Sequence, residues 1–142
     1  MAKRPSILTG TAGVYYVAYE LARRGYHAAV THGNAPTVDL LVANVEGEAS
    51  LSLQVKTTKG ALRTRGRGVN KVPHHYEWDV GEKLARNNRA NLFFAFVDLK
   101  SGRDDKPDVY IVPSKVVFDY FSPHQTLSRW RYHPMSRYYS TI

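Results

Sequence analysis

Asp39, Gln54 and Lys56 are three polar residues that the sequence pattern brings onto one face of a predicted β-hairpin. In residues 50–56, leucine and valine alternate with serine, glutamine and lysine, which is the period-2 pattern of a strand with one dry and one polar face. Gln54 and Lys56 therefore point the same way, roughly 7 Å apart. An acid, an amide and an ammonium group on one patch would place oxygen ligands, which hard cations prefer, beside a positive charge.

The turn of this hairpin decides whether Asp39 joins the patch. If Glu46 and Gly47 form the loop, counting back along the ladder places Asp39 directly opposite Gln54, at about 5 Å. A slip of one residue would turn Asp39 to the other face of the sheet. The first strand, 38–45, is otherwise almost entirely apolar, which predicts a central position in the sheet.

Periodicity predicts the elements that must carry these residues. A helix with an apolar stripe runs up to Gly25, with Glu20 on the flank of the stripe and residues 1–8 as a loose lead-in. The stretch 56–71 is expected to be a flexible, basic loop. Helices are predicted at 11–24, 80–87 and 113–121, and strands at 26–31, 38–45, 50–56, 92–99 and 108–112.

Chain length, cysteine content and the distribution of apolar residues limit the class of protein. Its 142 residues predict a single domain, 1–142, that is long enough to bury a hydrophobic core without disulfides or a structural metal. The chain has no cysteine, which excludes disulfides and thiolate metal sites and favours a reducing, cytoplasmic location. Tyrosines and Glu20 interrupt the apolar residues near the N-terminus, and no segment is expected to enter a membrane.

Positive charge is concentrated as well as abundant. The formal net charge is +8, which favours a polyanionic partner, above all nucleic acid. The basic residues of 56–71 face no acid, so this stretch is either a solvated charged loop or a phosphate clamp. Adjacent histidines at 74 and 75 favour packing or phosphate contact over a metal site. The candidate nucleic-acid contacts are Lys59, Arg63, Arg65, Arg67, Lys71, His74, Arg129 and Arg131.

The C-terminal segment, 122–142, interleaves cations with aromatic rings. This composition suits stacking on bases or closing a dimer, and it equally suits a basic tail packed against the sheet. The residues concerned are Arg129, Trp130, Arg131, Tyr132, Arg137, Tyr138 and Tyr139.

A helical Glu20, Asp39 at a strand start and Gln54-Val55-Lys56 on the partner strand together resemble the PD-(D/E)XK nuclease superfamily, which includes restriction enzymes and archaeal Holliday junction resolvases. The chain departs from the pattern because Pro36 is not adjacent to Asp39, and because Gln54 stands where most members have an acid. The resemblance implies an α/β, restriction endonuclease-like core, in which helices flank a mixed sheet of about five strands in the order α-β-β-β-α-β-β-α.

The resemblance also implies a catalytic set of Glu20, Asp39, Gln54 and Lys56. Asp39 would be the principal ligand of Mg²⁺ or Mn²⁺, the Gln54 amide and the Val55 carbonyl would supply further oxygens, and Glu20 would bind directly or through water. Lys56 would orient the attacking water or stabilise developing charge. Such a centre hydrolyses phosphodiester bonds, because the cation activates water and neutralises charge on phosphate.

The sequence leaves three functions open. The first is a metal-dependent DNA endonuclease, of the junction-resolving, homing or restriction type, which would act as a homodimer or higher homo-oligomer because cutting two strands needs two sites. The second is a nucleic-acid-binding module of the same fold without catalysis, since Gln54 replaces a carboxylate. The third is an accessory protein whose basic face meets an acidic partner protein.

Overall fold

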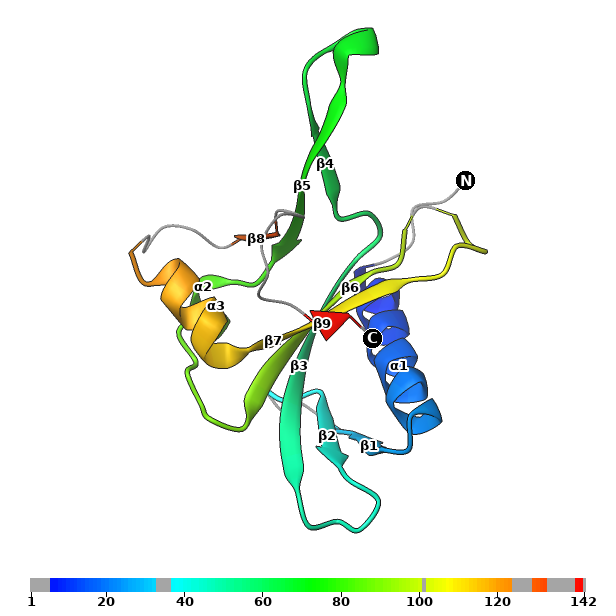
Figure 1. Cartoon of the computed structure of the whole chain (residues 1–142), viewed down its shortest axis with the longest axis vertical. Helices are drawn as coiled ribbons and strands as arrows, with labels where there is room; N and C mark the ends of the chain where they lie inside the picture. Colours follow the sequence, from blue (N-terminus) through cyan, green and yellow to red (C-terminus); the bar gives the residue numbers. More distant parts are fainter. Residues whose placement is uncertain (1–5, 33–36, 101, 124–128, 133–139, 142) are drawn as a thin grey trace.

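The computed structural model describes residues 6–32, 37–100, 102–123, 129–132 and 140–141 (Figure 1). Pro36 and the tail positions 133–139 lie outside them. Along the described residues the elements are α1 (Ser6–Arg23), β1 (His27–Val30), β2 (Leu40–Ala43), β3 (Ser50–Thr58), β4 (Leu62–Arg65), the 3₁₀ turn η1 (Gly68–Asn70), β5 (Val72–Asp79), α2 (Glu82–Ala85), β6 (Leu92–Asp98), β7 (Asp108–Pro113), α3 (Ser114–Phe121), β8 (Arg129–Tyr132) and β9 (Ser140–Thr141).

The central sheet is mixed and has the strand order β1-β2-β3-β6-β7-β9. The first three strands form an antiparallel meander, β3 pairs with β6 in parallel, and β6 pairs with β7 antiparallel. A parallel pair needs a long crossover, and the segment containing β4, β5 and α2 provides it. The predicted fold class, a mixed sheet flanked by helices, is confirmed, with β9 as a short additional edge strand.

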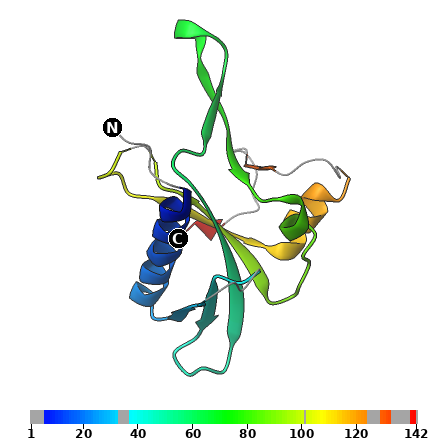
Figure 2. The same cartoon turned by 180° about the vertical axis from the view of Figure 1, so that it is seen from behind.

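Helix α1 covers one face of the meander (Figures 1 and 2). Val17 of α1 is fully buried, and it packs in one cluster with the inward residues of the sheet, among them Leu40 and Leu53. The helix begins at Ser6, earlier than the sequence pattern predicts, so residues 6–8 belong to it and not to a loose lead-in. No helix in the described part of the chain is both long and apolar enough to pass through a membrane.

The opposite face of the sheet is covered at its β6–β7 side by α2, α3 and a small second sheet of order β4-β5-β8. Trp78 of β5 joins the two sheets, since its indole N–H donates to the Val97 carbonyl at 2.9 Å. Trp130 of β8 is 2% exposed and stacks on Phe96 at 5.4 Å between ring centroids. Of the alternatives for the tail, Trp130 therefore packs against the protein and is not a surface ring that stacks on bases.

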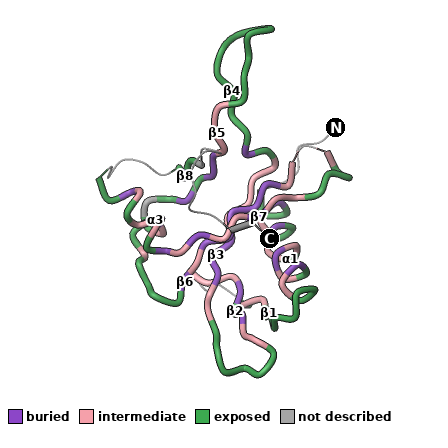
Figure 3. The backbone as a smooth tube through the Cα atoms, viewed as in Figure 1, coloured by how far each residue is buried: buried purple, intermediate pink, exposed green. Residues whose placement is uncertain are grey.

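The basic stretch 56–71 is ordered, contrary to the prediction of a flexible loop. Strands β4 and β5 pair antiparallel with a register shift between Arg63 and Thr64, and the resulting hairpin projects from the body (Figures 1 and 3). The shift interrupts the period-2 pattern, which explains why sequence periodicity misses the strand. Val69 at the tip is fully exposed.

Gly13 sets how closely α1 approaches the sheet. A Cβ atom at this position would overlap the Thr57 side chain of β3, whereas one at Gly10 would meet nothing within 4 Å. Only a glycine at position 13 therefore allows the present distance between the helix and the strand.

We predict that Gly13→Ala lowers the free energy of unfolding by about 1–3 kcal/mol, the usual cost of overpacking. Gly10→Ala is the matched control, and it should be neutral or stabilising by up to about 1 kcal/mol because alanine favours helix. Urea denaturation of both variants measures this. Equal stabilisation of both would contradict the close approach of α1 to β3.

Candidate active site

Strand β3 is longer than its antiparallel partner β2, and this difference in length creates the site. β3 spans nine residues, but β2 pairs only with Ser50–Leu53. The second half of β3 keeps β6 on one side, and among the described residues it has no strand partner on the β2 side. A free strand edge leaves backbone groups that need other hydrogen-bond partners.

Asp39, directly before β2, supplies one of these partners. Its carboxylate Oδ2 accepts a hydrogen bond from the Val55 backbone N–H at 2.7 Å, and its own N–H donates to the Leu53 carbonyl at 2.8 Å. The ladder pairs Leu40 with Leu53, so the register places Asp39 opposite Gln54. The predicted register is confirmed, although the turn is wider than two residues because the strands end at Ala43 and Ser50.

Asp39, Gln54 and Val55 line one cleft of about 540 Å³. The rest of its wall comes from the N-terminal half of α1 and from the end of β1, including Ile7, Gly10, Thr11, Val14, Tyr15, Val30, Thr31 and His32. Gln54 is 8% exposed, and its side-chain oxygen Oε1 has no hydrogen-bond partner among the described residues. A buried acceptor without a donor costs about 1–3 kcal/mol, so we expect a water molecule or a cation to be bound at this oxygen.

Burial perturbs both charged groups of the site. It raises the pKa of Asp39 above its ordinary value of 3.8, against the opposing effects of the Val55 N–H and of Lys56. Burial also lowers the pKa of Lys56, and the charges of Asp39 and Asp79 act in the opposite direction. Both groups are thus partly desolvated charges, a condition typical of functional sites.

Lys56 lies on the same face of β3 as Gln54, as strand parity predicts. Gln54 is in register with Phe94 and Lys56 with Phe96, and both phenylalanines belong to the core on the face away from α1. Asp79, at the end of β5, is the second carboxylate that acts on Lys56. Sequence reasoning misses Asp79, because only the packing of β5 against β3 brings it near.

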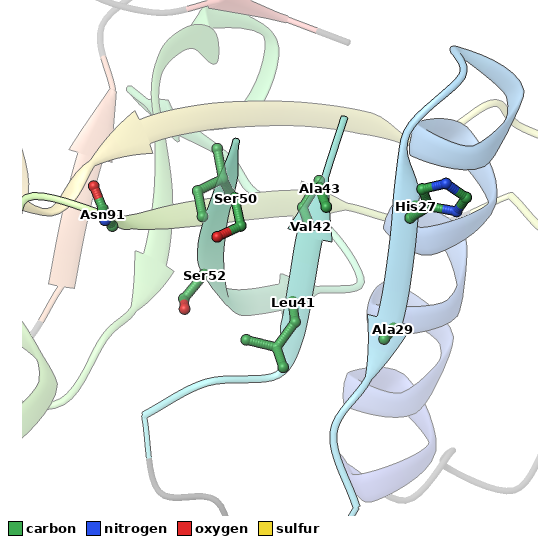
Figure 4. Close-up of a pocket in the computed structure, with 9 residues that line it drawn as sticks. His27, Ala29, Leu41, Val42, Ala43, Ser50, Ser52 and Asn91 are labelled. Carbon is green, nitrogen blue, oxygen red and sulfur yellow. The ribbon is translucent and has the colours of Figure 1, made fainter. Parts of the chain in front are cut away.

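On the same face, towards the turn between β2 and β3, the described residues leave the meander uncovered. A hollow of about 360 Å³ there is lined by residues of β1, β2 and β3, among them Leu41 and Ser52, and by Asn91 (Figure 4). Leu41 is 53% exposed, so β2 is apolar on both faces without being buried on both. Gln54 and Lys56 follow Ser52 on this face at alternate positions of β3.

Glu20 does not join the site, and the prediction that it would is corrected. It is buried near the C-terminal end of α1, where its carboxylate pairs with Arg24 and lies 3.7 Å from Arg23. The hydrogen bond from Arg24 is the main reason that its pKa is lowered. The residues of α1 that line the cleft end at Tyr15, and Glu20 follows about 7.5 Å further along the helix axis.

Asp39, Gln54 and Val55 offer oxygen ligands, and the cleft is also lined by His32. Asp39 offers a carboxylate and Gln54 an unpartnered amide oxygen, with the Val55 carbonyl on the same strand. No group of three or more histidine, cysteine or acidic residues that would suit a metal occurs within the described part of the chain. The set therefore fits a hard cation such as Mg²⁺ better than zinc, although it contains a single carboxylate.

The predicted nucleic-acid contacts divide into two groups. Along the projecting hairpin and at its base lie exposed or half-buried cations, namely Lys59, Arg65, Arg67 and Lys71. The other arginines, Arg63, Arg129 and Arg131, gather around Glu77 of β5. The rings of His74 and His75 contact each other, with their Nδ1 atoms 2.7 Å apart.

The architecture, a mixed sheet flanked by helices, also occurs in a solved structure. A search of solved structures finds the bacterial homing endonuclease I-Ssp6803I, with a TM-score of 0.57 and 16% sequence identity over 95% of this chain and 80% of that one. No family model and no curated protein matches the sequence. At this identity the similarity establishes the fold alone.

We predict that Asp39→Asn raises the thermal midpoint in a chelating buffer near neutral pH. Because the pKa of Asp39 is raised on folding, the folded protein keeps this proton to higher pH than the unfolded chain. Its ionisation therefore costs stability, and the cost grows as the pH rises through the folded-state pKa. Asparagine keeps an acceptor for the Val55 N–H without the charge.

Thermal scans at about pH 4 and about pH 7 measure this difference. The rise in thermal midpoint caused by Asp39→Asn should be larger at the higher pH. Asp104→Asn, at an exposed loop position, should show no such trend. A gain that is the same at both pH values would refute the idea that buried charge is the cause.

Proposed function

We propose that this protein is a metal-dependent DNA endonuclease of the PD-(D/E)XK type with a Gln-X-Lys variant of the motif. The observation that carries the proposal is the buried, unpartnered oxygen of Gln54 opposite the desolvated carboxylate of Asp39. A divalent cation would give the Gln54 oxygen a partner and would offset the negative charge of the buried Asp39 carboxylate. Lys56, on the next position of the same face, completes the set.

Each residue has a distinct part in the proposed reaction. Asp39, fixed by the Val55 N–H, and the Gln54 amide would hold Mg²⁺ or Mn²⁺ together with the Val55 carbonyl. When bound, the cation would lower the pKa of a water ligand and neutralise charge on the phosphate. Lys56 would orient the attacking water or stabilise the charge that develops on the phosphate oxygens. Burial lowers the pKa of Lys56, which makes it easier for the ammonium group to give up a proton.

The neighbouring surfaces suit a nucleic acid. The projecting β4–β5 hairpin is a two-stranded ribbon, an element that the major groove of DNA accommodates, and it carries the cations Arg65, Arg67 and Lys71. The fold neighbour, I-Ssp6803I, is a homing endonuclease, which supports the homing type among the endonuclease types. Cutting both strands requires a second active site, so we include a homodimer or higher homo-oligomer in the proposal.

A second candidate function is a DNA-binding module without catalysis. It is favoured by the position of Glu20, whose pairing with Arg24 leaves Asp39 as the only carboxylate lining the cleft within the described residues. Weak cation affinity would follow from that low charge. The two candidates differ in whether binding is accompanied by cleavage.

A cleavage assay tests the enzyme. Plasmid and branched DNA, incubated with the protein and Mg²⁺ or Mn²⁺, should be cut, and Asp39→Ala and Lys56→Ala should each reduce the rate by about 10²-fold or more. Asp104→Ala and Lys115→Ala change exposed residues of the same types and should retain activity. Binding without cleavage in either metal would support the module, and unimpaired cutting by both site variants would refute the assignment of the site.

Gln54→Glu tests the cation site without relying on activity. The added carboxylate should lower stability in chelator, because it adds a buried charge, and should tighten the cation affinity about tenfold, or about 1.4 kcal/mol. Thermal midpoints across a Mn²⁺ titration measure both effects. If the midpoint of Gln54→Glu responds to Mn²⁺ no more than that of the original protein, Gln54 is not a ligand.

A further inference from the structure

Glu77 of β5 holds three arginines and a histidine around one buried carboxylate. It is 6% exposed. Its two oxygens lie 3.1 Å from Arg131 Nε, 3.4 Å from Arg129 Nη1, 3.4 Å from Arg63 Nε and 3.4 Å from His75 Nε2. A buried carboxylate needs a partner, but one bidentate arginine would be enough.

The register of the small sheet explains this convergence. Arg131 stands directly opposite Glu77, Arg129 stands opposite Asp79, and Arg63 stands opposite His75 on the other neighbouring strand. Directly opposed and diagonal neighbours on one face of a sheet are within reach of long side chains. Along β5, Tyr76 and Trp78 face the core, so the alternate positions 75, 77 and 79 face outward. The three arginines from β4 and β8 are therefore fixed on this outward face.

The cluster has more positive charge and more donors than its acids use. Three arginines face Glu77 and Asp79, so the formal sum is +3 − 2 = +1. Each guanidinium has five N–H donors, far more than two carboxylates can accept. The arginine side chains remain 46%, 58% and 46% exposed at positions 63, 129 and 131, so a ligand can reach them.

The cluster lies beside the candidate active site. Arg129 Nε is 3.3 Å from Asp79, and the charge of Asp79 acts on Lys56. Strands β3 and β5 also pack against each other. A strand of nucleic acid that contacted Lys56 would therefore pass close to Asp79 and to the arginine paired with it.

We propose that Arg63, Arg129 and Arg131, held in place by Glu77, form a phosphate clamp for the DNA backbone next to the cleft. Glu77 is then a positioning residue, since it fixes the three guanidinium planes before the ligand arrives and reduces the entropy lost on binding. The inference rests on the proposed function for the identity of the ligand. It goes beyond that function because it states that Glu77, although negatively charged, raises the affinity of the protein for DNA.

Glu77 stays charged in the pH range where the clamp would work. Burial by itself would raise its pKa, but hydrogen bonds from Arg131 and His75 and the charges of Arg129 and Arg131 lower the pKa overall. The anchor is therefore an ionised carboxylate at neutral pH.

Glu77→Gln separates positioning from simple charge. The substitution raises the formal net charge from +8 by one unit, so charge alone predicts tighter binding to DNA. The clamp predicts weaker binding, by about three- to tenfold, and a salt dependence shallower by about 0.9 for each phosphate that the variant no longer neutralises. Fluorescence anisotropy with a short DNA duplex of mixed sequence in EDTA, over a series of salt concentrations, measures both quantities.

Glu48→Gln is the matched control, because it makes the same charge change at an exposed turn residue; it should bind as tightly as the original protein or more tightly. Arg131→Lys keeps the charge and removes the planar fork, and it should weaken binding about threefold or more. It also decides the question if circular dichroism shows that Glu77→Gln is unfolded. Tighter or unchanged binding by folded Glu77→Gln, or unchanged binding by Arg131→Lys, would overturn the clamp.

These measurements are independent of catalysis. A protein that cuts DNA but binds it equally well after Glu77→Gln would remain a nuclease without this clamp. A protein that cuts nothing, yet loses affinity in Glu77→Gln and Arg131→Lys, would retain the clamp and lose the proposed hydrolytic activity.

Discussion

The hydrogen bond from the Val55 N–H to the Asp39 carboxylate, 2.7 Å long, is the contact on which the candidate site depends. β3 continues beyond its pairing with β2, and its backbone there would otherwise lack a partner on that side. Leaving such a donor unsatisfied costs about 1–3 kcal/mol. A side chain at the start of the shorter strand satisfies it, and the same contact fixes Asp39 opposite Gln54. One local mismatch in strand length thus accounts for both the opening in the sheet and the position of its acid.

The part of this site that lies within one hairpin was predictable. Alternation along β3 gives the face of Gln54 and Lys56, and the turn near Gly47 gives the register with Asp39, because period and loop length are properties of adjacent residues. Glu20 was not predictable in the same way. A helical stripe indicates which face is buried, but not how far along the sheet the helix sits. Arg24, four residues after Glu20, was the available signal for an ion pair within the helix.

The basic stretch shows a second limit of sequence reasoning. Three glycines and many cations between residues 59 and 71 are typical of a loop, and the register shift after Arg63 hides the strand periodicity. The glycines instead serve the turn, where Gly66 and Gly68 have positive φ values of 100° and 56°. The partners of Glu77 were still less accessible, because Arg131 lies 54 residues away in the chain. Only the assembled sheet brings these charges together.

The low net charge of the proposed centre would make cation binding and DNA binding depend on each other. Asp39 contributes −1, Lys56 contributes +1 and Gln54 is neutral, so the formal sum of the three is −1 + 1 = 0. A divalent cation held by so few protein charges would gain its remaining negative ligands from the phosphate of the substrate. Cation and DNA would then each strengthen the binding of the other by the same factor. In such a centre the basic surfaces contribute to catalysis as well as to recognition, because the phosphate that they position also completes the ligand shell of the cation.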